Sequence, residues 1–587
     1  MDHLEEICVS RLRFLKYSLA AGVVVWAGTG SAEARDLFRA SRVAPERFPQ
    51  SVASGDPRPD GIVLWTRLKP PRGGGRVQVG YRIAPDDGRS DAEAFRNPLL
   101  SGTARTGPER DYTVKVQLQR PELRPFRKYR YRFYYDGAVS RTGRFKTLPA
   151  PDSDPGRLRF AYVSCQDYTN GYYNALGALA REQVDFVVHL GDYIYETVAE
   201  ESFQGGGPPE RRIPPSAIGS GSPGEADTLK DYRFLYRKYK SDRNLQRVHE
   251  NFAFIMTWDD HEFANDSFRF FAPDAAGEVR DPARRAAANR AWVEFNPVGV
   301  YYDPSKSPLE QIVIYRAFDF GRLATLVITD ERLYRDGPPC GLETSRRYVT
   351  PGCGRERAPG RTMLGAKQKE FFLKKITDSR STWKIWGNEV QFMQTKVLNT
   401  FLGAARGILP DVPPSNLPGG VYLTLDQWDG YQAERAEIAR RIRRAGVKNF
   451  VIITGDIHSF AAGYVKEDYE NLSNKPPNAV GVCFVGGSVT SSNLYEIVRL
   501  GQSDTGPAVK NPAGLEAALR VSNPHYEFFN SSTHGYNLIE VTKQELVCTM
   551  KHVETIREPL KNPQARALAR FRVPSGRVEI QRTDLPL

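Results

Sequence analysis

The chain has 587 residues, of which 40% are apolar and 26% are charged, and its 82 Lys and Arg exceed its 69 Asp and Glu by 13. This composition excludes a disordered chain, six cysteines are too few for a disulfide scaffold, and the length predicts two to four domains. The positive charge is spread along the chain without a dense Lys/Arg block, so it indicates either an ordinary basic surface or attraction to an anionic partner.

Residues 1–34 are predicted to be an export signal. The basic stretch SRLRFLK (10–16) precedes the apolar stretch YSLAAGVVVW and the small-x-small cleavage pattern at 32–34. SRLRFLK resembles the twin-arginine motif, but Leu12 stands where a second arginine is expected, so the twin-arginine and general secretory routes both stay open. An N-terminal amphipathic helix is the alternative. Because no stretch is long and apolar enough to span a bilayer, we expect an exported protein, periplasmic or secreted, and not an integral membrane protein.

Residues 47–148 are predicted to form a small all-β domain. Short runs such as GIVLWTRL and YRYRFYYDG are rich in β-branched and aromatic residues and alternate with turn residues. This spacing is typical of an immunoglobulin- or fibronectin-like sandwich. The segment PAPDSDP (149–155) then reads as a linker.

Residues 157–550 are predicted to form an α/β domain. Apolar runs such as VDFVVHLGDYIYE and KNFVIITGDIHSF end in polar turns, and helical patterns such as ERAEIARRIRRAG lie between several of them. In such folds, ligands bind beyond the carboxyl ends of the strands. The Arg- and Pro-rich residues 551–587 are expected to be a C-terminal tail that packs as an appendage.

Two cysteines, Cys340 and Cys353, flank a short loop bounded by Pro and Gly (CGLETSRRYVTPGC). If the protein is exported, a disulfide closing this loop is expected. The alternative is two loop thiols that do not pair.

Reactive side chains directly follow the apolar runs of the α/β domain. An Asp after a strand is usually a turn former, so each one alone is weak evidence, but five groups in series would converge on one crevice. The candidates are Cys165, Asp167, Asp192, Tyr195, Asp259, Asp260, His261, Asn388, Glu389, Asp456 and His458.

Carboxylates gathered this closely cannot all stay ionised without cations, so the cluster predicts two metal ions. A thiolate and a phenolate favour a trivalent ion such as iron, whereas Asp and Asn oxygens favour calcium, manganese or magnesium. An Asp192 carboxylate that bridges both ions would let them clamp a phosphoryl group and activate a water. His261, beside Asp260, would protonate the leaving alkoxide or stabilise the developing charge, with Glu196 and Glu262 holding the ligands in place.

The motifs that carry these residues resemble the alkaline phosphatase D (PhoD-like) family of calcineurin-like metallophosphoesterases. They cover most of residues 48–545 and include RFPQSVASGDPRPDGIVLWTRL, FAYVSCQDY, VVHLGDYIYE, TWDDHEFANDS, GNEVQFMQ, ITGDIHSF and VGGSVTSS. The resemblance implies an N-terminal β-sandwich followed by a two-sheet αββα catalytic sandwich. It also implies hydrolysis of phosphomonoesters or phosphodiesters outside the cytoplasm.

The resemblance further implies a role for each candidate. The iron-side ligands are Cys165, Asp192, Tyr195 and His458, and the residues facing the second metal are Asp260, Asn388 and Asp456. Cys165-Gln166-Asp167 resembles the iron-and-calcium type, so Fe³⁺ with calcium is expected, and manganese, magnesium or zinc are the alternatives. Asp260 and His261 are the expected catalytic residues. The roles of Asp167, Asp259 and His534 stay open, and Arg332, Tyr334 and Trp428 are candidates to line the pocket.

The expected activity is that of an alkaline phosphatase or phosphodiesterase acting on a small phosphate ester at alkaline pH. A phospholipase D-like phosphodiesterase is a close alternative. A non-catalytic exported binding protein on the same scaffold belongs to a different class. No dedicated protein or nucleic-acid partner is predicted.

Overall fold

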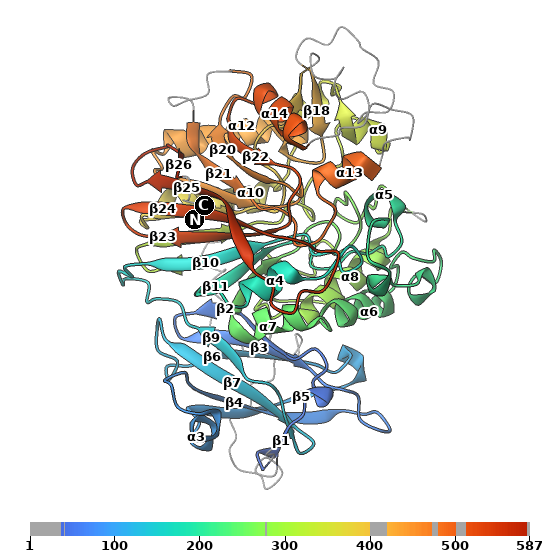
Figure 1. Ribbon diagram of the computed structural model, residues 1–587, viewed down its shortest axis with the longest axis vertical. Coiled ribbons are helices and arrows are strands. Elements are labelled where there is room, and N and C mark those ends of the chain that lie inside the picture. The colour runs from blue at the N-terminus through green and yellow to red at the C-terminus, as the bar shows by residue number, and fades with distance from the viewer. Residues whose placement is uncertain are drawn as a thin grey trace. The chain divides into compact units, whose positions relative to one another are not determined.

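The computed structural model describes residues 37–39, 42–275, 279–398, 420–471, 479–500 and 512–583. The predicted export signal, residues 1–34, therefore lies outside the described residues. The chain divides into two compact units (Figure 1). The first comprises Met1–Ala150, Tyr236–Ile255 and Ala286–Val313, and the second comprises Pro151–Leu235, Met256–Arg285 and Ile314–Leu587. Within the described ranges, no helix is both long and apolar enough to cross a membrane.

The first unit is built from two groups of paired strands that share one buried core. One group has the order β1-β8-β7-β4-β5, with β9 on β7: β1 (Arg42–Val43), β8 (Ala138–Val139), β7 (Lys128–Tyr135), β4 (Val77–Pro85), β5 (Leu100–Thr106) and β9 (Gly143–Lys146). The other has the order β12-β2-β3-β6: β12 (Ala253–Thr257), β2 (Val52–Arg58), β3 (Gly61–Arg67) and β6 (Thr113–Gln119). Ile62 and Leu64 of β3 lie in the same apolar cluster as Ile83 of β4 and Phe133 of β7.

The helices with residues in the first unit range from 6 to 14 residues in length. The helices with residues in this unit are α3 (Asp91–Arg96), α6 (Leu229–Tyr239), α7 (Arg243–Asn251) and α8 (Pro282–Phe295). Ser90 caps α3 by accepting a hydrogen bond from the Glu93 backbone N–H, and the Glu93 carboxylate accepts one from the Ser90 backbone N–H. This reciprocal pair satisfies two otherwise free N–H groups at the start of a six-residue helix.

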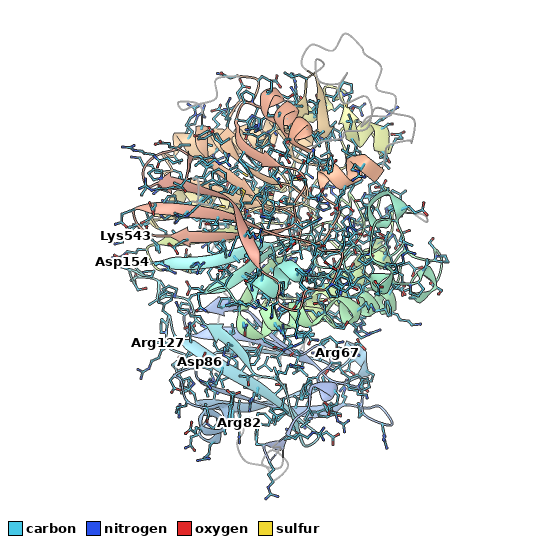
Figure 2. All side chains as sticks on the ribbon, in the orientation of Figure 1. Arg67, Arg82, Asp86, Arg127, Asp154 and Lys543 are labelled. Carbon is cyan, nitrogen blue, oxygen red and sulfur yellow. A yellow bond between two sulfur atoms is a disulfide. The ribbon has the colours of Figure 1, made fainter. Side chains whose placement is uncertain are left out.

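One sheet of the second unit joins the end of the chain to its early strands. Its order is β26-β25-β24-β23-β10-β11: β26 (Gln581–Arg582), β25 (Ala565–Pro574), β24 (Glu545–Val553), β23 (Gly535–Val541), β10 (Leu158–Val163) and β11 (Phe186–Leu190). In Figure 1 the red strands β23, β24 and β25 lie beside the teal strand β10. Lys543, between β23 and β24, forms an ion pair with Asp154, which precedes β10 (Figure 2).

The structure differs from the sequence prediction at the C-terminus. We expected residues 551–587 to form an appended tail, but β25 pairs with the whole length of β24 and β26 pairs with β25. The buried Ala569, Phe571 and Val573 alternate with more exposed neighbours, which is the period of a strand with one covered face. This segment therefore belongs to the sheet.

The other sheet of the second unit is mixed, with three parallel and three antiparallel strand pairings. Its order is β13-β14-β16-β19-β21-β20-β22: β13 (Arg316–Phe320), β14 (Ala324–Ile328), β16 (Trp383–Gly387), β19 (Phe450–Thr454), β21 (Ala479–Val485), β20 (Phe460–Lys466) and β22 (Tyr526–Asn530). A small sheet has the order β15-β18-β17: β15 (Tyr348–Thr350), β18 (Val421–Thr424) and β17 (Lys396–Val397). The remaining helices are α4 (Asn174–Leu179), α5 (Glu201–Gln204), α9 (Thr344–Arg347), α10 (Ala366–Asp378), α12 (Gln432–Arg444), α13 (Leu494–Leu500) and α14 (Pro512–Ser522).

Aromatic side chains connect the two large sheets of the second unit. The Phe186 ring on β11 stacks on Phe320 of β13, with 4.9 Å between centroids. The Tyr162 hydroxyl on β10 donates to the Phe484 carbonyl on β21 over 2.8 Å. Helices α10 and α12 contribute Phe372 and Ile438 to the core around the second sheet. Residues that follow the parallel strands of both sheets are thereby held in fixed positions.

Candidate active site

The candidate residues come from turns at the carboxyl ends of the strands. Strands β10 and β11 run parallel, as do β14, β16, β19 and β21 in their sheet. Because carboxyl ends of parallel strands lie at one edge, the turns that follow them can meet there. The structure brings together seven of the predicted residues in this way: Cys165, Asp192, Tyr195, Asp260, His261, Asp456 and His458.

Four of these residues have a left-handed backbone. The φ angles are 58° at Cys165, 55° at Asp192, 67° at Asp456 and 50° at His458. Side chains other than Gly seldom adopt this conformation, and it persists where surrounding contacts hold it. Such strained residues gather at functional sites, and here they lie on three different turns.

Gly191 permits the close approach of two of these turns. Its φ is 96°, and a Cβ built on it would lie 2.4 Å from the Asp259 Cβ and 2.6 Å from the Asp259 backbone nitrogen. Glu262 ties the same turns together, because it accepts hydrogen bonds from the backbone N–H groups of Asp192 (3.0 Å) and Asp259 (2.8 Å). Any larger residue at 191 would push the turns apart.

One half of the site combines a thiol, a phenol and an imidazole. Single ligand atoms of Cys165, Asp192 and His458 lie within 4.8 Å of one another. The Tyr195 hydroxyl donates to Asp192 Oδ2 over 2.9 Å and lies 3.3 Å from His458 Nε2. Burial and the nearby Asp192 carboxylate raise the pKa of the Cys165 thiol well above its usual value. Without a cation, this half would therefore keep its thiol protonated.

The other half is a group of four carboxylates, which we call the aspartate cluster: the buried Asp192, Asp259 and Asp260, and the partly buried Asp456. Oxygens of all four lie within 4.8 Å of one another. Burial, followed by repulsion from Asp259 and other carboxylates, raises the pKa of Asp192 well above its usual range, although the charge of His261 opposes this. Asp259 and Asp260 each contribute an oxygen to this cluster, so the structure does not select one of them as the ligand.

Arg332 is the cation that the chain itself supplies to the aspartate cluster. Its fully buried guanidinium forms ion pairs with Asp259 and with Asp456 (3.2 Å) and lies 3.5 Å from Asp260. A further ion pair of 2.7 Å joins it to Asp426. The single guanidinium of Arg332 does not balance the charge of four carboxylates.

Two carboxylate oxygens of the cluster have no donor. Among the described residues, no hydrogen-bond partner reaches Asp192 Oδ1 or Asp259 Oδ2, although both atoms are buried. Buried polar atoms are almost always satisfied, so each exception calls for an explanation. The donor set and these two oxygens fit cations bound beside Asp192.

His261 is oriented by Glu196. Its Nδ1 lies 2.7 Å from Glu196 Oε2, and the second Glu196 oxygen accepts the Asn265 backbone N–H over 2.7 Å. Burial alone would lower the pKa of His261, but Glu196, Asp260 and Asp192 outweigh it and raise the pKa well above its usual value. The imidazole packs on the Tyr195 ring at 4.0 Å between centroids, with Phe203 at 5.7 Å. His261 is thus a positioned imidazole beside the aspartate cluster, and its acidic neighbours favour its protonated form.

Asn388 is buried directly after β16, but its side chain hydrogen-bonds to residues outside the aspartate cluster. Its Oδ1 accepts the Trp428 indole N–H over 3.1 Å, and its Nδ2 donates to the Val390 carbonyl. The Asn388 oxygen retains a second lone pair beyond its bond to Trp428. Trp428, a predicted pocket-lining candidate, is fully buried, as is Glu389, which accepts the hydroxyl of Thr257.

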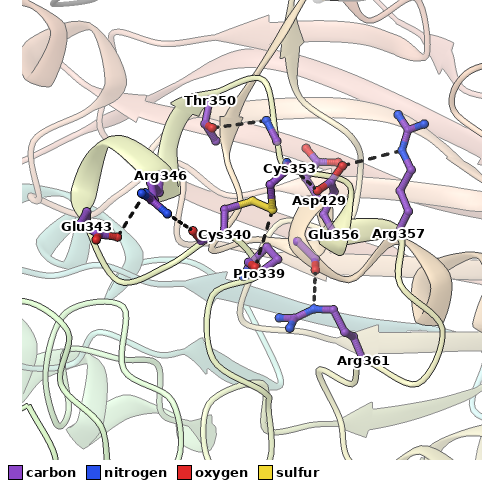
Figure 3. Close-up of a disulfide and its surroundings, with 12 residues drawn as sticks. Pro339, Cys340, Glu343, Arg346, Thr350, Cys353, Glu356, Arg357, Arg361 and Asp429 are labelled. Atoms are coloured by element: carbon purple, nitrogen blue, oxygen red, sulfur yellow. Dashed lines mark hydrogen bonds and ion pairs between the residues drawn. A yellow bond between two sulfur atoms is a disulfide. The ribbon is translucent and has the colours of Figure 1, made fainter.

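The structure joins Cys340 and Cys353 in a disulfide with 5.8 Å between their Cα atoms (Figure 3). Nearby, Arg346 forms an ion pair with Glu343 and donates to the Cys340 carbonyl. The closed loop also carries Arg347, whose buried guanidinium pairs with Asp266. The Asp266 backbone N–H donates to Asp260 Oδ2 over 2.6 Å, so this loop supports the site indirectly.

Three groups of neighbouring residues were missed by the sequence analysis or left open in it. Gln427 donates to Asp456, and Ser491 and Ser492 contact Tyr195 and His458. Asp167, whose role was open, accepts hydrogen bonds from Thr169 and Gln204. Serine and glutamine are common in turns, so only the family-like stretch VGGSVTSS marked this region in the sequence.

Known proteins resemble this chain over most of its length. A PhoD-like phosphatase model matches residues 160–550, and a model of the PhoD-like phosphatase N-terminal domain matches residues 31–149. The chain is 32% identical over 518 residues to alkaline phosphatase D of Bacillus subtilis (strain 168), covering 87% of this chain and 78% of that protein. A solved structure of PhoD superimposes with a TM-score of 0.74 at 29% identity, covering 93% of this chain and 94% of that one.

Proposed function

This chain belongs to the PhoD-like phosphatase family and is a hydrolase of phosphoric esters, and from that premise we propose an exported enzyme that uses two cations at alkaline pH. Its substrates are phosphomonoesters, phosphodiesters or both. The family is metal-dependent, and the chain offers several buried groups of acidic, thiol and imidazole ligands.

One observation carries the proposal. Asp192 Oδ1 is buried without a hydrogen-bond partner among the described residues, and Asp192 belongs to three of the possible ligand groups. A carboxylate buried in that position is costly without a counter-charge, and a cation held by these groups would supply it. Asp192 is therefore the proposed bridge.

The two halves of the site favour different ions. Cys165, Tyr195 and His458 would hold Fe³⁺, because a trivalent ion stabilises anionic sulfur and phenolate donors. The oxygens of Asp260, Asp456 and Asn388 would hold calcium, with manganese, magnesium or zinc as alternatives. Asn388 would bind through the amide oxygen that also accepts the Trp428 N–H.

Bound cations would neutralise the phosphoryl oxygens and lower the pKa of a bound water. The chain's own residues supply the rest. His261 holds a proton beside the aspartate cluster and is oriented by Glu196, which suits it to protonate the leaving oxygen. The left-handed turns at Cys165, Asp192, Asp456 and His458 fix the ligands before substrate arrives.

The proposal also includes the type of sandwich that each unit forms and the export of the protein. The two large sheets of the second unit form the αββα sandwich of a metallophosphoesterase, and the first unit is an immunoglobulin- or fibronectin-like sandwich. The predicted signal at residues 1–34 and the Cys340–Cys353 disulfide support export, because disulfides persist in oxidising compartments.

Hydrolysis of nitrophenyl phosphate and bis(nitrophenyl) phosphate at alkaline pH tests the proposal. Mature protein starting near residue 35 is assayed with and without calcium, and the same sample is analysed for metals. Metal-dependent release from either ester is expected, and the ratio of rates ranks phosphatase against diesterase. No release from a fully loaded sample would contradict the proposal. A phospholipid assay on that sample would then separate a phospholipase D-like enzyme from a binding protein.

A further inference from the structure

The turn after β21 is buried although almost every residue in it is polar. It reads Ser488-Val489-Thr490-Ser491-Ser492-Asn493, and the exposed fraction of each polar residue is 4% or less. Burying hydroxyl and amide groups costs free energy unless each one is hydrogen-bonded. The partners of this turn, which we call the serine turn (residues 488–493), therefore show what it holds in place.

The backbone of the serine turn holds the turn that carries Cys165. The N–H groups of Thr490 and Ser491 donate to the Cys165 carbonyl over 3.3 and 3.2 Å, and Val489 donates to the Ser164 carbonyl over 3.1 Å. Cys165 has a left-handed φ of 58°, a conformation that needs such support. Three hydrogen bonds from one short segment provide it.

The Ser491 hydroxyl fixes the position of the Tyr195 phenol. It donates to the Tyr195 oxygen over 2.6 Å and accepts the Asp167 backbone N–H over 3.2 Å. The Tyr195 hydroxyl in turn donates to Asp192. A donor aimed at a phenol oxygen fixes the ring and stabilises negative charge on that oxygen.

The Ser492 carbonyl holds the imidazole. It lies 2.7 Å from His458 Nδ1, and since a carbonyl can only accept, that nitrogen carries the proton. His458 Nε2 then presents its lone pair on the side of the Tyr195 oxygen, 3.3 Å away. The tautomer that a metal ligand requires is set by this one contact.

The far side of the serine turn is anchored by His534, whose role the sequence left open. The Ser488 hydroxyl donates to the Ser491 carbonyl over 2.6 Å and lies 3.0 Å from His534 Nδ1. His534 Nε2 lies 3.2 Å from Asn493 Nδ2 and 3.1 Å from Glu496. These contacts tie the turn to the strand that follows His534.

We infer that the serine turn positions the thiol, phenol and imidazole of the iron-side half, and that Ser491 is the positioning residue for Tyr195. The inference rests on the proposed function, because it concerns how a phenolate would be presented to Fe³⁺. It accounts for four hydrogen bonds that join one segment to Cys165, Tyr195 and His458.

Ser491→Ala is the test, and Ser492→Ala is its matched control. Both substitutions remove one buried hydroxyl with two hydrogen bonds, but the Ser492 hydroxyl contacts Phe203 and Asn170, and its carbonyl remains on His458. Each full-length mature variant is loaded with Fe³⁺, challenged with a chelator, and measured for retained iron and for the visible phenolate-to-iron absorption band. Thermal unfolding of the metal-free forms checks that they are folded.

Ser491→Ala is expected to retain iron about 10-fold more weakly, as is usual when a residue that orients a ligand is lost. Its absorption band should move to longer wavelength, because the phenolate loses a hydrogen-bond donor, while Ser492→Ala keeps the wild-type band. Equal behaviour of the two variants, or a wild-type result for Ser491→Ala, would overturn the inference alone. A wild-type protein that takes up no iron would instead contradict the proposed function, and the inference with it.

A second variant covers the case in which Ser491→Ala does not fold. Ser491→Thr keeps the hydroxyl and is expected to retain iron and the band position. Folded Ser491→Thr that loses the band would overturn the inference.

Discussion

Two buried aspartates of the second unit, Asp192 and Asp426, have the same low exposure and opposite electrostatic surroundings. Asp426 pairs with Arg335 (2.6 Å) and Arg332 (2.7 Å), and despite its burial these two cations lower its pKa below the usual range. Asp192 has a buried oxygen without a partner among the described residues, and its pKa is raised. Two arginines of the chain neutralise Asp426 directly, whereas in the proposed function a bound cation neutralises Asp192.

The largest effect is expected from Asp192→Asn. It should reduce ester hydrolysis to the level of the metal-free protein, because it removes the bridging charge. The metal-free variant should be at least as stable as metal-free wild type, since the lost charge was repelled by Asp259 and Asp260. Steady-state assays and urea unfolding measure the two effects, with the exposed Asp152→Asn as control. A metal-free variant less stable than wild type would contradict this view of Asp192.

His261→Asn should lower turnover about 100-fold, the usual contribution of a general acid. Metal content should stay at the wild-type level, because Asp192 and Asp260 remain as ligands. The measurement is turnover at saturating ester with elemental analysis of the same sample. Loss of both metals would mean that His261 is a ligand, and the division of roles in the aspartate cluster would have to change.

Asp426→Asn should act on stability. It leaves Arg332 and Arg335 as buried cations without their shared partner, which costs about 3 kcal/mol of unfolding free energy. Urea unfolding of the metal-free protein measures it. The matched control is Asp87→Asn, which breaks the exposed Asp87–Arg89 pair and should have no measurable effect. If Asp426→Asn left the unfolding free energy unchanged, groups other than Asp426 would have to stabilise the two buried arginines.

The smallest effect is a pH dependence of the metal-free protein. Burial and neighbouring carboxylates raise the pKa of Asp456 to about 7, although Arg332 opposes the shift. Because the folded-state pKa lies above the unfolded one, Asp456 adds stability at low pH, and this contribution is lost as the pH rises through about 7. From pH 5 to 8, wild type should lose at least about 1 kcal/mol relative to Asp456→Asn. Parallel stability curves for the two proteins would contradict this expectation.

Residues with distinctive chemistry could be predicted from the sequence. Cys165, Asp192, Asp456 and His458 follow apolar strands directly, and the structure brings them together. Ser491 could not be assigned a role, since its contact with Tyr195 joins turns that are 296 positions apart. Hydrogen-bonding turns of this kind carry no local pattern that separates them from ordinary loops.

The C-terminal strands show a different limit. The Arg- and Pro-rich composition of residues 551–587 predicted a tail, although Phe571 and Val573 alternate with Arg570 and Arg572. The alternation of apolar and charged residues that is typical of a strand was present in the sequence, but the many Arg and Pro residues led to the prediction of a tail. Short edge strands such as β26 have too few residues for any pattern to be read.

The pairing of β10 with β23 sets the order in which the enzyme can be completed during synthesis. The strand that leads to Cys165 finds its parallel neighbour β11 early, but its antiparallel neighbour begins only at Gly535. Translation delivers the N-terminal segments first, so a chain still emerging from the ribosome lacks one side of this strand. If the turn at Cys165 binds a metal as proposed, binding is therefore expected only after synthesis is nearly finished, and a chain terminated before β23 is expected to bind it weakly.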